Sequence, residues 1–209
     1  MPPVTEILAA RVIVVEGKDE QSFFAKIIEH MDLQDFQVLP IGGKTKLRSE
    51  LKALVRTRGF ANVKALGIAR DADQDAQSAF QSVVDAVRDV DSFSLCIPEE
   101  PLKLVGERPS IAVVILPGNN RPGALEDLCL EAVADDSATI CLNEYFKCLE
   151  KQNIRIAPER MGKAKTHAFL ASREKPDLRF GEAAEADYWP FEAKAFESIK
   201  TFLRLLSNG

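Results

Sequence analysis

The sequence of 209 residues has no apolar run that approaches the roughly 20 residues needed to span a bilayer. Its beginning also lacks a basic segment followed by a long apolar core. We therefore expect neither a membrane association nor a secretory signal. The four cysteines form no CxxC pair, which argues against structural zinc and favours a reduced, cytoplasmic protein. Internal repeats and low-complexity segments are absent from the sequence.

An excess of positive charge is also missing. The chain has 27 lysines and arginines against 32 aspartates and glutamates, for a formal net charge of -5. This balance argues against attraction of nucleic acid to the whole surface, but a local basic face remains compatible with binding. Apolar residues make up 46% and charged residues 28% of the chain, which is typical of a globular protein.

The first half of the chain alternates short apolar runs with amphipathic segments. Runs rich in Val and Ile suit strands that are covered on both faces, and the segments between them have helical spacing. This order predicts an α/β fold with a mostly parallel sheet and helices on both faces. The expected strands are residues 11–16, 36–41, 63–69, 92–97 and 111–116, and the expected helices are residues 19–30, 44–58 and 75–90.

The second half of the chain is predicted to be helical. The candidate helices are residues 123–134, 138–151, 163–173 and 191–206, and residues 174–188 read as an irregular polar stretch. We place a boundary near residue 135. This divides the chain into an α/β domain over residues 1–135 and a helical C-terminal extension over residues 136–209 that packs on or near it.

Acidic residues follow two of the predicted strands. Glu16 comes after the first strand, and Asp71 and Asp73 come after the third. Carboxylates at one sheet edge repel one another, and a divalent cation relieves that repulsion. Mg²⁺ prefers hard oxygen ligands, so this edge is a candidate Mg²⁺ site, with Mn²⁺ as a substitute. The alternative is that Asp73 and Asp75 are helix caps or solvated turn residues.

The residues Val14-Val-Glu-Gly-Lys-Asp-Glu20 and Asp71-Ala-Asp73, each placed after a strand, resemble the two signatures of the Toprim fold. The resemblance covers roughly residues 10–135. Toprim proteins include topoisomerases, primases, recombination mediators and OLD-type nucleases. The arrangement is most similar to small stand-alone Toprim-related proteins of unknown function, which are similar to the OLD-type nuclease module.

The resemblance implies a role for each matching residue. Glu16 corresponds to the first acid and Glu20 to a second one, one helical turn later, while Asp71 and Asp73 form the DxD motif. Glu126 is the candidate for a later acid, although Ala124 stands where the family pattern has a hydroxyl residue. A late lysine of the family corresponds to Lys165, with Lys163 as its competitor. The metal ligands implied are Glu16, Glu20, Asp71, Asp73 and Glu126, and the catalytic residues implied are Glu16, Asp71, Asp73 and Lys165.

A basic stripe follows the second predicted strand. Gly42-Gly43-Lys44 lacks the earlier glycine of a P-loop, which we therefore reject. The two glycines either form a plain turn or let the backbone approach a phosphate at a helix N-terminus. Lys44, Arg48 and Lys52 recur every four residues and either bind nucleic-acid phosphates or form a solvated helix face.

These features predict a Mg²⁺-dependent phosphodiesterase or nuclease, a hydrolase acting on nucleic acid, with DNA ranked ahead of RNA. Water rather than Tyr145 or Tyr188 is the expected nucleophile. The main alternative is a noncatalytic Toprim-like module that binds metal or nucleotide and acts with a partner ATPase. A primase-like nucleotidyltransferase is a third alternative. An oligomer is compatible with the sequence, and the particular substrate is not encoded in a readable motif.

Overall fold

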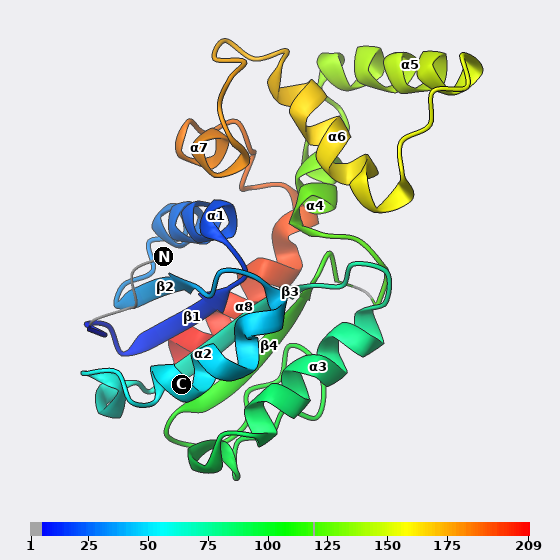
Figure 1. Cartoon of the computed structure of the whole chain (residues 1–209). Helices are drawn as coiled ribbons and strands as arrows, with labels where there is room; N and C mark the ends of the chain where they lie inside the picture. Colours follow the sequence, from blue (N-terminus) through cyan, green and yellow to red (C-terminus); the bar gives the residue numbers. More distant parts are fainter. Residues whose placement is uncertain (1–5, 119) are drawn as a thin grey trace.

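The computed structural model describes residues 6–118 and 120–209. Its centre is a four-stranded sheet made of β1 (Arg11–Val15), β2 (Phe36–Pro40), β3 (Ala65–Asp71) and β4 (Ser110–Leu116). The strands lie in the order β2-β1-β3-β4, and every neighbouring pair is parallel. Helices cover both faces of this sheet (Figure 1). The structure confirms the predicted α/β class.

The helices account for most of the remaining chain. In the described residues they are α1 (Lys18–His30), α2 (Leu47–Leu54), α3 (Ala76–Arg88), α4 (Leu125–Ala132), α5 (Ser137–Lys151), α6 (Pro158–Leu170), α7 (Phe180–Glu185) and α8 (Glu197–Asn208). Helices α2 and α3 pack on one face of the sheet, and α1 and α8 pack on the other. The chain after β4 leaves the sheet through α4, continues through α5, α6 and α7, and returns as α8 (Figure 1).

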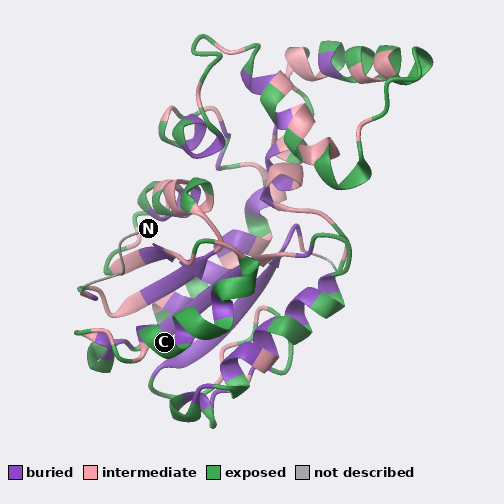
Figure 2. Cartoon of the chain, viewed as in Figure 1, coloured by how far each residue is buried: buried purple, intermediate pink, exposed green. Residues whose placement is uncertain are grey.

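Side-chain alternation along each strand divides the interior into two cores. Ile13 of β1 and Val114 of β4 face the core that contains α1 and α8. Their neighbours Val12 and Val113 face the core that contains α2 and α3. Because alternate residues of a strand point to opposite faces, a continuous run of Val and Ile fills both cores. Strand β4 is accordingly buried throughout and β1 and β3 over most of their length, whereas β2 at the sheet edge is only partly buried (Figure 2).

Helix α8 returns the C-terminal part of the chain to the sheet. A Cβ atom added at Gly67 of β3 would lie 2.6 Å from side-chain atoms of Phe202 and Leu206. The close approach of α8 therefore depends on a residue without a side chain. Arg11 also donates hydrogen bonds to the Leu206 and Ser207 carbonyl oxygens. Helices α5 and α6, in contrast, lie away from the sheet (Figure 1).

Several predicted elements differ from the observed ones. Residues 92–97 form no strand: a 3₁₀ turn over Asp91–Phe93 follows α3, and Phe93 and Cys96 are buried in the core that contains α2 and α3. The helix predicted over 44–58 starts as a 3₁₀ turn and ends at Leu54. The stretch 174–188 contains α7, and the last helix begins at Glu197 rather than near 191.

None of the helices in the described residues is both long and apolar enough to cross a membrane.

Candidate metal-binding site

The parallel sheet brings the predicted acidic residues to one edge. Glu16 directly follows β1, and Asp71 is the last residue of the neighbouring strand β3. The loop after β3 is joined to the loop before α4 by a two-way backbone pairing, in which Asp73 N–H donates to the Gly123 carbonyl at 2.9 Å and Gly123 N–H donates back at 2.7 Å. This pairing holds the start of α4, and with it Glu126, beside the strand ends.

Asp71 lies at the centre of the acidic residues. Its Oδ1 accepts a hydrogen bond of 3.1 Å from the N–H of Leu125, the first residue of α4. Burial raises the pKa of Asp71 well above its ordinary value, and the negative charges of Glu126, Glu16 and Glu20 raise that pKa further. The bond to Leu125 opposes the rise. The four carboxylates therefore lie within electrostatic range of one another.

Glu16 and Glu20 are half-buried and share this acidic environment. Burial raises the pKa of Glu16, and Arg70, whose Nη1 lies 3.7 Å from Glu16 Oε1, partly opposes that rise. Glu16 Oε1 is nevertheless buried without a hydrogen-bond partner among the described residues. Burial also raises the pKa of Glu20, as do the charges of Glu126 and Glu16. A carboxylate oxygen without a hydrogen-bond partner, placed among other carboxylates, has the chemistry of a divalent-cation ligand.

Asp73 is more exposed than the other acids, although its charge also raises the pKa of Glu16. It has a left-handed backbone, with φ of 52°, and its side chain is 48% exposed. Its Oδ2 lies 2.7 Å from Lys44 Nζ, so a predicted metal ligand is paired with a predicted phosphate contact. Asp75 is a helix cap, as the alternative to a metal ligand predicted. Its side chain accepts a hydrogen bond of 2.9 Å from Ser78 N–H at the start of α3.

The acidic residues fit Mg²⁺ in chemistry but do not form a finished coordination sphere. Throughout residues 6–118 and 120–209, no three His, Cys, Asp or Glu side chains stand close enough to hold one ion together. The carboxylates nevertheless perturb one another's pKa values. Mg²⁺ typically takes one or two carboxylates and keeps several waters, so it does not require three direct protein ligands. Glu16, with its orphaned oxygen, and Asp71 are the residues best suited to this role.

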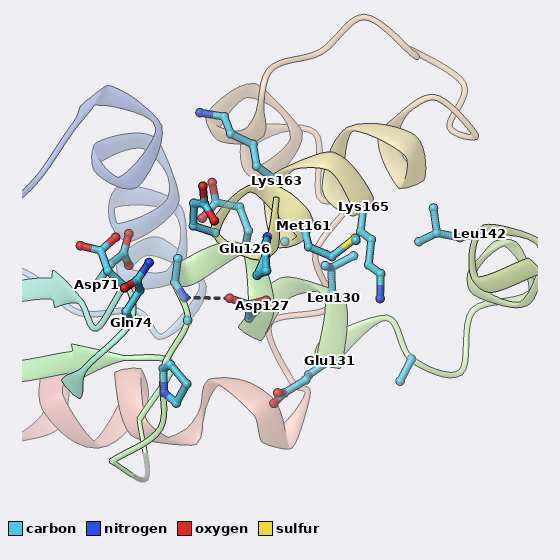
Figure 3. A pocket seen from close by; sticks show the side chains of 18 of the residues that line it. Asp71, Gln74, Glu126, Asp127, Leu130, Glu131, Leu142, Met161, Lys163 and Lys165 are labelled. Carbon is cyan, nitrogen blue, oxygen red and sulfur yellow. Dashed lines mark hydrogen bonds between the residues drawn. The ribbon is translucent and has the colours of Figure 1, made fainter. Parts of the chain in front are cut away.

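A large pocket opens beside these acids. Its volume is about 880 Å³, and residues from the β3 end, the loop before α4, and helices α4, α5 and α6 line it. Asp71, Asp73, Glu126 and Asp127 are among its lining residues. Asp127 Oδ2 accepts a hydrogen bond of 2.8 Å from Ala124 N–H, which ties the first turn of α4 to its entry loop (Figure 3). A side chain at Gly162 would collide with Asp127, so this glycine lets α6 approach α4 closely.

Both candidate lysines line the pocket but differ in direction. Lys163 and Lys165 extend to opposite sides of α6, and Lys165 points away from Asp71, on the side of the pocket where Leu130 and Leu142 lie (Figure 3). The Lys165 ammonium also lies 5.9 Å from the centre of the Phe146 ring, a cation–π distance. The arrangement therefore separates Lys165, the lysine that the sequence favoured, from its competitor Lys163.

The predicted basic stripe is split between two acidic partners. Lys44 contacts Asp73, whereas Arg48 and Lys52 both reach Asp89 at the end of α3, at 3.0 and 3.9 Å. All of these side chains are substantially exposed. Exposed ion pairs of this kind contribute little stability. Little free energy is therefore lost if Lys44, Arg48 or Lys52 leaves its carboxylate for a phosphate group. Binding of nucleic acid by the stripe stays a prediction.

The glycines before the stripe serve the acidic site structurally. The N–H groups of Gly42 and Gly43 both donate to the Glu16 carbonyl oxygen at 2.9 Å. Both residues have positive φ values, which explains why glycine is required in this turn. The turn thus fixes the backbone of Glu16. The N–H groups of Gly42 and Gly43 would have to donate to a phosphate in the predicted contact, but both already donate to the Glu16 carbonyl oxygen.

Two solved structures of the C-terminal region of the OLD protein from Xanthomonas campestris pv. campestris resemble this chain, and each alignment covers 96% of it. One, phased with mercury, has a TM-score of 0.52 at 15% identity over 96% of its own length. The other, phased with iodine, has a TM-score of 0.50 at 17% identity over 95%. These likenesses define the class of α/β fold. The chain itself belongs to the family described as "Protein of unknown function (DUF3226)", which matches residues 10–208. A search of curated proteins finds no match.

Proposed function

We propose that this protein is a metal-dependent phosphodiesterase with a Toprim-like site that cleaves nucleic acid. The observation that carries the proposal is the gathering of Asp71, Glu16, Glu20 and Glu126 beside an open pocket. These carboxylates repel one another, and the packing of the fold does not require acidic residues at these positions. Ligands of α/β sheets bind at the carboxyl ends of strands, where these residues lie. The motif resemblance to Toprim proteins and the fold shared with the OLD C-terminal region support the same proposal.

Glu16 and Asp71 are the proposed ligands of Mg²⁺, joined by Asp73 when it leaves Lys44. Glu20 and Glu126 are positioned to bind a second ion or its waters. A bound divalent ion supplies a water molecule of lowered pKa and polarises the phosphoryl oxygens. The Leu125 N–H fixes one Asp71 oxygen and leaves the other carboxylate oxygen for the ion. Arg70, beside Glu16, offsets part of the negative charge of the cluster.

Lys163 is the proposed phosphate contact in place of Lys165. Lys165 lies near the Phe146 ring, whereas Lys163 extends to the other side of the same helix (Figure 3). A single cation aimed at the phosphate contributes charge stabilisation in the transition state. Replacing Lys163 with Gln is therefore expected to slow cleavage more than replacing Lys165 with Gln.

A noncatalytic module that acts with a partner ATPase is the second candidate. Two contacts favour it: Asp73 is engaged by Lys44, and Lys165 is turned away from the acids. In that case metal or nucleotide would bind at the acidic site without cleavage, and the site would serve assembly or sensing.

Single-turnover cleavage of labelled single-stranded DNA, duplex DNA and RNA, with Mg²⁺ and with Mn²⁺, separates the two candidates. Wild type should cleave at least one substrate, and Asp71→Asn and Asp73→Ala should reduce the rate to background. Asp91→Asn, at an exposed carboxylate remote from the pocket, is the matched control and should cleave normally. If wild type binds metal but cleaves nothing, the noncatalytic candidate replaces the proposal. Cleavage that survives in both variants would remove the acidic site from the chemistry.

A further inference from the structure

The pocket beside the acids has an apolar wall that metal binding does not require. Leu130 of α4, Leu142 of α5 and Met161 of α6 all line it. Leu142 is buried, and the other two are partly buried. A site that only held a metal ion and a phosphate would need polar walls. This side of the pocket is therefore built for an apolar or aromatic part of a ligand.

Each of the three helices turns a pair of residues spaced by four into the pocket, and such pairs share one helix face. Helix α4 presents Glu126 together with Leu130. In the same way, α5 presents Thr139 with Asn143, and α6 presents Met161 with Lys165. The acidic end, the apolar wall and further polar groups, among them Glu131 beside Leu130, thus form one continuous lining (Figure 3).

The volume of about 880 Å³ lies within the range of roughly 300–1,000 Å³ that is usual for small-ligand pockets. The ligand must also carry a group for the acidic end, which accepts a phosphate once a divalent ion is bound. A flat, apolar ring with hydrogen-bonding edges, attached to a phosphate, meets all of these requirements. Asn143 offers both a donor and an acceptor to such an edge.

We propose that the pocket between α4, α5 and α6 holds one unpaired nucleobase of a nucleic-acid strand, and that the protein acts on single-stranded rather than duplex substrate. The base lies against Leu130, Leu142 and Met161, and its phosphate lies at the acidic end. A base in a duplex is stacked and paired, so it reaches this wall only after extrusion, which costs a few kcal/mol. A single strand avoids that cost. This inference rests on the proposed function, because it assigns the acidic end to a phosphate.

Fluorescence anisotropy tests the inference without any cleavage. A labelled single-stranded DNA 12-mer, the same sequence as a duplex, and the labelled mononucleotide are each titrated with the protein in CaCl₂. The single strand should bind about tenfold more tightly than the duplex. Met161→Gln keeps the length and helix propensity of the side chain but makes the wall polar, and it should weaken single-strand binding several-fold. Met161→Leu should restore that binding.

A second variant blocks the pocket from its rim. Ala134 is exposed and lines the pocket, so Ala134→Trp should obstruct its rim without disturbing a core. Ala171→Trp, at an exposed position at the end of α6 outside the pocket, is the matched control. Only Ala134→Trp should weaken single-strand binding.

Equal affinity for duplex and single strand, or unchanged binding in both Met161→Gln and Ala134→Trp, would overturn the inference. So would binding of the mononucleotide as tight as that of the strand, which would make a free nucleotide the ligand. The proposed function fails separately, through the absence of metal-dependent cleavage and of metal binding in wild type. Equal cleavage of duplex and single strand would therefore support the proposed function and contradict this inference.

Discussion

Replacing Asp71 with Asn should stabilise the protein in the absence of metal. Asn keeps an oxygen that accepts the hydrogen bond from Leu125 N–H, but it removes the charge that burial disfavours and that Glu126, Glu16 and Glu20 repel. Each tenfold change in proton affinity on folding corresponds to about 1.4 kcal/mol. We expect the free energy of unfolding to rise by on the order of 1–3 kcal/mol. For a chain of this size, that raises the melting temperature by roughly 2–4 °C per kcal/mol.

The same substitution should remove the response to metal. In wild type, a divalent ion that binds only the folded protein adds about 2.7 kcal/mol when its concentration is 100 times its Kd. Thermal melting in EDTA and in excess Mg²⁺ or Mn²⁺ measures both effects. The variant should melt higher than wild type in EDTA and show no rise with metal.

Asp75→Asn is the matched control for this experiment. Asp75 is close in sequence, but it is exposed, and its hydrogen bonds to the start of α3 lower its pKa. Asn caps helices about as well as Asp, so melting should change little and the metal response should persist. If Asp71→Asn lowers the melting temperature in EDTA, the repulsion inferred among the four acids is wrong. An undiminished metal response in that variant would place the ion elsewhere.

Three further predictions concern pH, charge and packing. Folding raises the pKa of Asp71, so the folded protein binds this proton more tightly than the unfolded chain does. The stability that this proton contributes is lost as the pH rises from 3.8, the ordinary pKa of Asp, to the raised pKa of the folded protein. The difference in melting temperature between Asp71→Asn and wild type should therefore grow with pH across that window, and a constant difference would contradict the linkage. Replacing Lys44, Arg48 and Lys52 together with Gln should weaken nucleic-acid binding and flatten its salt dependence, and an unchanged salt slope would return these residues to a solvated face. Gly67→Ala should destabilise the fold by about 1–3 kcal/mol in denaturant unfolding, because its Cβ would meet Phe202 and Leu206, whereas a neutral result would show that α8 can shift.

The sequence predicted the parallel sheet and the strand-end acids for a simple reason. Continuous runs of Val and Ile supply two cores at once, and the direction of parallel strands places their carboxyl ends together. Glu16 and Asp71 could therefore be assigned to one edge before the structure was known. Glu126 depended on the family resemblance, and its placement is explained by the backbone pairing of Asp73 with Gly123, which no local pattern encodes.

Other features depend on tertiary contacts that sequence patterns do not contain. Helix α7 is short, and its approach to α1 depends on Gly181, where a side chain would meet the Asp19 backbone and Ser22. Asp19 Oδ1 also accepts a hydrogen bond of 3.2 Å from Gly181 N–H. The ion pair of Lys44 with Asp73 joins residues 29 positions apart. Residues 92–97 look like a strand because short apolar runs do not distinguish a strand from a buried irregular segment.

The pocket was also beyond sequence reasoning, since its walls come from β3 and from three helices that follow β4. Each pair of residues spaced by four on α4, α5 and α6 is a common helical pattern. Only the packing of α6 against α4 at Gly162 brings these pairs to one cavity beside the acids.

Anomalous diffraction from a crystal soaked in Mn²⁺ tests metal binding by the acidic site most directly. We predict a peak at the carboxyl ends of β1 and β3, bound directly by Glu16 or Asp71 at about 2.1 Å and by the remaining acids directly or through water. The same soak of Asp71→Asn crystals should leave this position without a peak. A wild-type crystal with no peak there, or with its peak remote from Glu16 and Asp71, would contradict the proposed site.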